Sequence, residues 1–123
     1  MRIKTGRYGG FTIVELMIVV AVIGLLLAMA IPTFVKSRDT SQLGVVYNNL
    51  RAIETAKDQW ALDNHKGTGD VTDLPTLSDY LKNGKIKQVL NEVYESNRIG
   101  SAAYATTNVR LGTYAPTDPI SIP

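Results

Sequence analysis

The sequence predicts an α+β fold, in which a long N-terminal helix is followed by a small head with a short antiparallel β-hairpin. Two observations carry this prediction. Residues 11–35 form an apolar run whose single ionisable side chain is Glu15. After this run, apolar side chains recur every three or four residues as far as Ala61. That spacing is typical of one buried face of an α-helix.

The length and composition allow one small soluble domain. The chain has 123 residues, and the apolar run leaves fewer than about 100 of them for a soluble body. Cysteine is absent, so the disulfides that stabilise many small exported domains are excluded. Stability must therefore come from packing, from assembly or from a bound ion.

The charge balance argues against a nucleic-acid-binding module. The formal net charge is +2, but Arg2, Lys4 and Arg7 supply more than that. From Phe11 onward the chain is close to neutral, with no concentrated positive patch of the kind that binds nucleic acid. We therefore expect no nucleic-acid partner.

The apolar run is long enough to cross a membrane. Residues 16–35 carry no charge, and about twenty such residues span a hydrocarbon core as a helix. The basic residues lie before this run, which predicts a cytoplasmic N-terminus. A carboxylate such as Glu15 costs on the order of 2.5–3.5 kcal/mol at mid-bilayer and less near the interface. Glu15 therefore requires a partner that offsets this cost.

A secretory signal peptide is one alternative for the same segment. Ala28-Met29-Ala30 matches the small-residue rule for signal cleavage, and a cut there would release a secreted protein starting at Ile31. The apolar region is longer than the usual 7–15 residues of a signal peptide. Pro32 would also be the second residue of the product. Both features favour retention of the helix.

The local sequence around Glu15 supports a different processing site. The segment Gly10-Phe11-Thr12-Ile13-Val14-Glu15-Leu16 resembles the cleavage site of type IV pilins and of the type II secretion and competence pseudopilins. The resemblance implies that a prepilin peptidase removes residues 1–10 and methylates the new N-terminus at Phe11. Glu15, Gly24 and Pro32 then occupy family positions as the fifth, fourteenth and twenty-second residues of the processed chain.

The chemistry of this segment fits that resemblance. Gly10 lets an extended backbone enter a protease site without a Cβ in the way. Cleavage creates an α-amino cation on Phe11, and opposite charges attract strongly where the dielectric constant is low. We expect the amine of one subunit to neutralise Glu15 of a neighbour and to fix their register. The alternative is a Glu15 side chain that stays hydrated among lipid headgroups.

Gly24 and Pro32 mark the weakest part of the predicted transmembrane and assembly helix, residues 11–35. Pro32 removes the amide that would bond to the Ala28 carbonyl, and Gly24 lowers helix stability by about 1 kcal/mol relative to alanine. We expect a kink in the isolated subunit. We also expect this stretch to unwind when subunits pack into a fibre.

Residues 36–63 are predicted to continue the helix as an amphipathic segment that ends near Asn64. Glu54 and Lys57 lie three residues apart on its polar side, which is a favourable spacing for an ion pair. The apolar stripe consists of Leu43, Val46, Tyr47, Leu50, Ile53, Ala56, Trp60 and Ala61.

Residues 64–123 form the predicted head. Thr76 and Asp79 fit a capping box that opens a short helix, and Asn83-Gly84 ends it. Residues 85–94 fit a helix better than a strand. Residues 102–107 and 109–115 are expected to form two short strands joined near Asn108. Their contacts with the long helix are expected to come from Tyr104, Val109, Leu111 and Tyr114.

Candidate catalytic and metal sites in the head are weak. His65 is the single histidine and lies in a polar loop, so catalysis and an enzymatic cofactor are not expected. Oxygen ligands for Ca²⁺ are conceivable in the loops after the helix, although solvated acids are the simpler interpretation. These weak candidates are Asp63, Asn64, Asp70 and Asp73. A small basic group, Lys82, Lys85 and Lys87, is compatible with contact to an acidic partner, although an ordinary charged surface is the simpler interpretation.

Two features depart from what the resemblance implies. Many pilins close a C-terminal loop with a disulfide, which is impossible without cysteine. Major pseudopilins commonly hold Ca²⁺ in a C-terminal acidic loop, whereas Asp118 is the single acid after Glu95. These departures concern the subfamily and leave the N-terminal resemblance intact.

By resemblance, the expected function is that of a structural subunit of a type IV pilus-like filament. Its partners would be a homo-oligomeric filament, the prepilin peptidase, membrane lipid, and an inner-membrane assembly platform with its ATPase. The subunit would span the bacterial inner membrane once before joining a periplasmic or cell-surface filament. The alternatives are a type II secretion pseudopilin, a DNA-binding competence subunit, and a monomeric membrane-anchored or secreted binding protein.

Overall fold

The computed structural model describes residue 6 and residues 9–123. The leader charges Arg2, Lys4 and Arg7, on which the predicted orientation in the membrane depends, lie outside the described residues. The chain forms two compact units, residues 1–35 and 36–123. Helix α1, Ile13–Asp63, contributes to both of them.

In the first unit, α1 exposes all of its large apolar side chains. Those between Ile13 and Val35 are 50–78% exposed, and Phe11 just before the helix is 86% exposed. Among the described residues, α1 is the one helix that is long and apolar enough to cross a membrane. Pro32 lies inside this helix, which has no helical break at that position.

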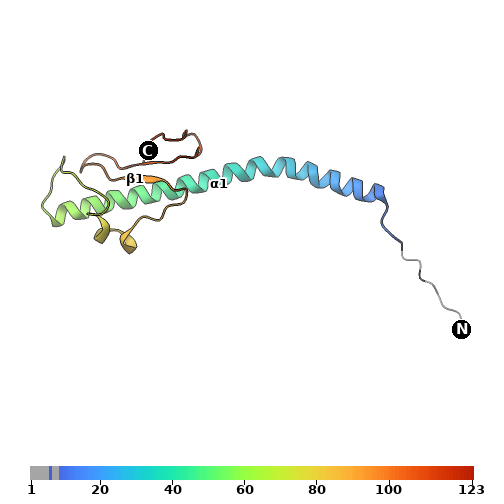
Figure 1. The fold of residues 1–123 in the computed structure, drawn as a ribbon, viewed down its shortest axis with the longest axis horizontal. Coiled ribbons are helices and arrows are strands. Elements are labelled where there is room, and N and C mark those ends of the chain that lie inside the picture. The colour runs from blue at the N-terminus through green and yellow to red at the C-terminus, as the bar shows by residue number, and fades with distance from the viewer. Residues whose placement is uncertain (1–5, 7–8) are drawn as a thin grey trace. The chain divides into compact units, whose positions relative to one another are not determined.

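In the second unit, a small antiparallel sheet and two 3₁₀ turns lie against residues 43–61 of α1 (Figure 1). The sheet has the strand order β1-β2-β3. Tyr94 of β1 is opposite Ala105 of β2, and Ala105 is opposite Ile120 of β3. The elements are η1 (Ser78–Tyr80), η2 (Lys82–Gly84), β1 (Val93–Glu95), β2 (Tyr104–Thr106) and β3 (Ile120–Ser121).

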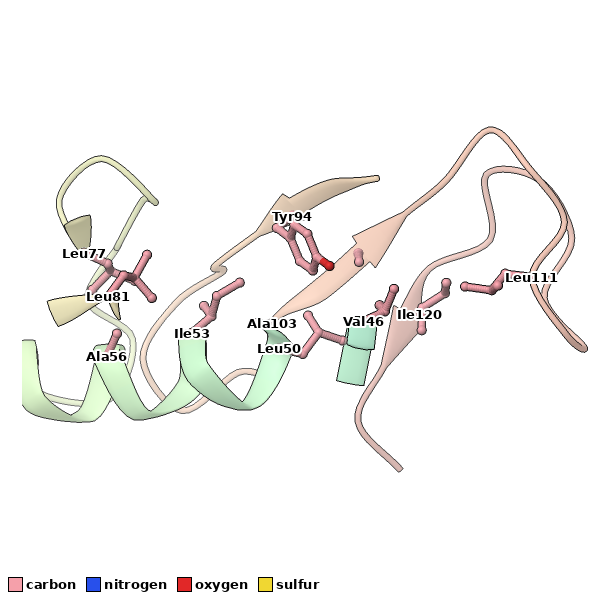
Figure 2. Packing of buried hydrophobic residues seen from close by; sticks show 11 residues of the cluster. Val46, Leu50, Ile53, Ala56, Leu77, Leu81, Tyr94, Ala103, Leu111 and Ile120 are labelled. Atoms are coloured by element: carbon pink, nitrogen blue, oxygen red, sulfur yellow. The ribbon is translucent and has the colours of Figure 1, made fainter. Parts of the chain in front are cut away.

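The hydrophobic core forms between α1 and this layer. In Figure 2 the α1 side chains point toward Tyr94, Ile120 and the turn residues Leu77 and Leu81. The predicted apolar stripe is confirmed, because each of its residues is buried or packs against the core. The α1 residues that are buried in this cluster are Val46, Leu50, Ile53 and Ala56, and Leu43, Tyr47 and Trp60 pack at its margin.

The end of α1 is a Schellman motif built on a histidine. The amide of Lys66 donates to the carbonyl of Ala61 at 2.9 Å, and the amide of His65 donates to Leu62 at 3.5 Å. His65 has a φ of 53°, the left-handed conformation that this motif requires and that glycine usually supplies. The predicted end near Asn64 is confirmed. His65 is the left-handed residue that ends the helix.

The helix predicted over residues 85–94 is wrong. This segment is a loop that leads into β1, and no described residue of it before Val93 lies in a helix or strand. The cause is Glu92, whose buried carboxylate accepts the amides of Val89 at 2.9 Å and of Leu90 at 2.6 Å. These local bonds bend the backbone into a turn and compete with helix formation.

The predicted capping box at Thr76 is also wrong. Asp73 is the capping acceptor instead, because its Oδ1 accepts the amide of Thr76 at 3.0 Å and also the hydroxyl of Thr76. The short element that follows is the 3₁₀ turn η1, which has no side-chain cap. The predicted helix end at Asn83-Gly84 is wrong as well, because η1 ends at Tyr80 and these two residues lie in η2 with φ values of 63° and 70°.

The predicted strand over residues 102–107 contains β2 and is confirmed, but the partner strand over residues 109–115 is wrong. Residues 109–115 form a tight turn in which Leu111 and Tyr114 exchange hydrogen bonds of 3.1 and 3.0 Å around Gly112. The neighbours of β2 are β1 and β3.

Two of the predicted packing contacts from this part of the chain are confirmed. Leu111 is fully buried, and Tyr114 packs against the core. Tyr104 is half-buried, whereas Val109 is 53% exposed and was wrongly expected to pack.

Candidate functional site

Among the described residues before α1, Gly9 and Gly10 make no contact that would require glycine. Gly10 and Phe11 lie outside the helix and are exposed. A Cβ placed on Gly9 or Gly10 would meet nothing within 4 Å. The fold of the described residues therefore gives no steric reason for glycine at position 10, and its role in processing remains a prediction.

Thr12 and Glu15 form a capping box at the start of α1. The amide of Glu15 donates to Thr12 Oγ1 at 3.1 Å, and Glu15 Oε2 accepts the amide of Thr12 at 3.0 Å. The Thr12 hydroxyl also donates to Oε2 at 3.2 Å. These reciprocal bonds satisfy two amides that a helix start leaves without partners. The Thr-x-x-Glu spacing was present in the sequence, but this capping role was not predicted from it.

The capping box uses only part of the Glu15 carboxylate. All three hydrogen bonds of the box involve Oε2 or the amide of Glu15, and no hydrogen bond to Oε1 forms within residues 9–123. An open hollow of about 410 Å³ lies beside this carboxylate, lined by Phe11, Glu15, Leu16, Ile18 and Val19. Glu15 therefore has a partner in its own chain and an acceptor left for a donor from outside.

We expect Thr12→Val to weaken the start of α1 by about 1 kcal/mol, because valine keeps the β-branched shape and removes the capping oxygen. The amides of Glu15 and Leu16 should then exchange roughly fivefold faster in lipid bicelles. NMR hydrogen exchange measures this rate. Thr33→Val is the matched control, since the Thr33 hydroxyl donates to Met29 inside the helix. Equal exchange rates in the two variants would contradict the capping role.

Gly24 and Pro32 both lie inside α1, and a Cβ on Gly24 would meet nothing within 4 Å. The fold of the single chain therefore gives no steric reason for glycine at this position. The predicted unwinding of this stretch in an assembled fibre remains a prediction.

The acidic residues considered for Ca²⁺ are used in local turns. Asp70 accepts the amide of Gly67 at 3.0 Å, and Asp73 accepts Thr76. The Asp63 carboxylate raises the pKa of the neighbouring Tyr80 hydroxyl, while the Asn64 side chain donates to Trp60. Within the described part of the chain, no three His, Cys, Asp or Glu side chains form a group able to hold a metal.

The structure does bring the basic group together. Lys82, Lys85 and Lys87 are exposed and line one hollow beside α1. From the sequence, contact with an acidic partner was one interpretation of these lysines, and an ordinary charged surface was the simpler one.

The comparisons with known proteins concern mainly the N-terminal segment. Residues 6–31 match the family model described as the prokaryotic N-terminal methylation motif. The chain is 30% identical over 95 residues to type II secretion system core protein G of Escherichia coli, an alignment that covers 69% of this chain and 66% of that protein.

Two pilins are also similar to this chain. The identity is 51% over 51 residues with the type IV major pilin protein PilA of Myxococcus xanthus, covering 42% of this chain and 23% of that protein. It is 43% over 58 residues with the type IV major fimbrial protein FimA of Dichelobacter nodosus, covering 47% and 37%. The chain thus spans less than two thirds of the length of each of these relatives. No solved structure matches the chain.

Proposed function

The chain belongs to the family of type IV pilins and type II secretion pseudopilins, and we propose that it is a structural subunit of a filament built from many copies. In this proposal a prepilin peptidase cuts between Gly10 and Phe11 and methylates the new N-terminus. Residues 11–35 then hold the subunit in the inner membrane and later form the centre of the filament. The role is mechanical, and no reaction is catalysed.

The observation that carries this proposal is an apolar helix with nothing to cover it. The large apolar side chains from Ile13 to Val35 are at least half exposed. Surface of this kind is stable only in lipid or against other apolar helices. In this proposal, lipid covers the apolar surface while the subunit is stored in the membrane, and neighbouring helices cover it in the filament.

The geometry of Glu15 supports a contact between subunits. Cleavage after Gly10 leaves the Phe11–Thr12 peptide bond intact, so the amide that bonds to Glu15 Oε2 survives processing. The remaining oxygen, Oε1, is available for the α-amino cation of a neighbouring Phe11. Packed apolar helices lower the local dielectric constant and so strengthen this attraction.

We expect Glu15→Ala to be processed and inserted into the membrane normally but to reduce filament yield by at least about tenfold, the equivalent of 1.4 kcal/mol. Electron microscopy and a sheared-filament assay measure the yield. Glu95→Ala, which removes an exposed carboxylate from the head, is the control. Normal filaments from Glu15→Ala would exclude the proposed contact.

Mass spectrometry of the mature N-terminus tests the processing step. A methylated Phe11 terminus is the expected result. A retained Met1, or a chain that starts at Ile31 after signal cleavage, would overturn the proposal. In either case no α-amino group would exist at Phe11 to pair with Glu15.

A type IV pilus and a type II secretion pseudopilus are both compatible destinations. The higher identity to the pilins lies in a short alignment. The alignment to core protein G covers 69% of this chain, more than residues 1–63 contain, and so extends beyond α1. This wider match favours the pseudopilus as the second candidate. Deleting the gene distinguishes them, because a pilus subunit is required for surface fibres and a pseudopilus subunit for release of a secreted enzyme.

A further inference from the structure

A basic hollow lies on the second unit. Its lining residues fall between positions 49 and 87, outside the predicted assembly helix of residues 11–35. The hollow has a volume of about 270 Å³ and is lined by three lysines, Lys82, Lys85 and Lys87. No carboxylate lines it. The remaining lining residues are Asn49, Ala52, Leu81, Asn83 and Ile86.

The loop that carries two of these lysines is fixed to α1. Asn49 Nδ2 donates to the carbonyl of Lys87 at 3.0 Å and to the hydroxyl of Tyr94 at 2.8 Å. The Tyr94 hydroxyl in turn donates to Glu92 Oε1 at 2.8 Å. Because the backbone is already held by these bonds, a partner that binds the lysines loses little loop entropy.

Among the described residues, the three lysines have no charge partner. Within residues 9–123 the only ion pair joins Glu54 and Lys57. Three exposed cations around one hollow create a positive potential that attracts an anionic surface. The hollow is therefore suited to carboxylates that belong to another molecule.

The same chain also contains an acidic segment, whose charge is opposite to that of the basic hollow. Residues 58–79 contain five acids and one base, Lys66. Four of the acids are exposed and Asp70 is half-buried. The acids are Asp58, Asp63, Asp70, Asp73 and Asp79.

We propose that the basic hollow of one copy binds the acidic segment, residues 58–79, of a second copy in the filament. This inference rests on the proposed function. The two surfaces differ, so the contact is heterologous, and a heterologous contact that does not close into a ring produces an open helical filament. Each copy supplies both surfaces, and the contact repeats along the polymer.

The contact is electrostatic and exposed, so it should depend on salt. Individual surface ion pairs are weak, and screening becomes effective beyond about 8 Å at 0.15 M salt. The contact between the basic hollow and the acidic segment sets the register between neighbouring heads, while the apolar helices hold the subunits together.

Charge reversal in the full-length chain tests the proposal. We expect Lys85→Glu with Lys87→Glu, or Asp58→Lys with Asp63→Lys, each to lower filament yield by roughly five- to thirtyfold at 0.15 M salt. Combining all four substitutions places opposite charges at these four positions again, in reversed order, and should restore the yield. Arg110→Glu, which reverses an exposed charge outside both surfaces, is the control and should leave the yield unchanged.

Cysteine cross-linking provides an independent measurement, since the chain has no cysteine of its own. Lys85→Cys and Asp63→Cys are placed in separate copies and expressed together. A disulfide-linked dimer that requires both variants supports the proposal. Filaments without this dimer would overturn it.

The outcomes separate this proposal from the proposed function. Both double variants could assemble weakly while the variant with all four substitutions fails to restore the yield. That result would overturn binding to a second copy and would indicate that the hollow binds a different anion. Normal yields from all charge variants would overturn the head contact and leave the filament function intact. Absence of filaments from the wild-type chain, with Phe11 correctly processed, would contradict the filament function itself.

Discussion

We expect Glu54→Ala to lower the free energy of unfolding of residues 36–123 by about 3–5 kcal/mol, because it leaves a buried ammonium without its carboxylate. Lys57 is 1% exposed, and its Nζ lies 3.2 Å from both oxygens of Glu54. The other acceptor of Nζ is the carbonyl of Ser101 at 2.6 Å. Glu54 also accepts the amide of Ala103, so its removal leaves this amide without an acceptor and leaves Lys57 with the Ser101 carbonyl alone.

Urea unfolding of the full chain in detergent micelles measures this loss through the fluorescence of Trp60, the single tryptophan, which packs at the margin of the core. Glu54→Met combined with Lys57→Met should recover most of the stability, since apolar residues of similar volume replace a buried pair without leaving a charge. Asp58→Ala, at an exposed position one turn away, is the control and should change stability by less than about 0.5 kcal/mol. Similar losses in Glu54→Ala and Asp58→Ala would contradict the buried role of the pair.

This ion pair also shows what the sequence could and could not predict in the helix. The favourable spacing of Glu54 and Lys57 was readable, because residues three apart on a helix are neighbours. Lys57 was nevertheless expected on the solvent side. It is buried because Ser101 and Ala103 lie over this part of α1, and that contact joins residues more than forty positions apart. Local periodicity carries no information about such a contact.

The head was predicted less well than the helix because its elements are short. Apolar residues at Val89, Leu90 and Val93 fit a helix, but a turn followed by an edge strand gives the same pattern. The buried carboxylate of Glu92 decides between them by accepting two backbone amides. The strand β3 was missed altogether because it has two residues, Ile120 and Ser121.

The candidate site was more accessible to sequence reasoning, since Gly10, Phe11 and Glu15 lie within six positions of one another. The cleavage motif and the pairing of an amine with a carboxylate could therefore be predicted without knowledge of the fold. The capping box was not predicted, because the Glu15 carboxylate was expected either to pair with a neighbouring subunit or to stay hydrated among headgroups, whereas its Oε2 accepts the amide of Thr12. The basic hollow was not predictable in the same way, because it requires α1 and the loop after η2 to meet.

We expect Glu92→Gln to destabilise residues 36–123 by about 1.5–3 kcal/mol at neutral pH, the cost of weakening hydrogen bonds to a buried charge. Glu92 is fully buried, and burial alone would raise its pKa. The amides of Leu90 and Val89 and the hydroxyl of Tyr94 outweigh this effect, so that the pKa of Glu92 lies below its ordinary value. Burial raises the pKa of Tyr94, which keeps its hydroxyl protonated as a donor.

The lowered pKa fixes the direction of the pH dependence. The stability that ionised Glu92 contributes is fully present above its unfolded value of about 4.5 and is lost as the pH falls through the lower folded value. Urea unfolding monitored by Trp60 should therefore show a large difference between wild type and Glu92→Gln at neutral pH. This difference should shrink under strong acid. Glu95→Gln changes an exposed carboxylate on β1 and should follow the wild type throughout. A Glu92→Gln difference that is constant with pH would mean that side-chain shape, rather than charge, holds this loop.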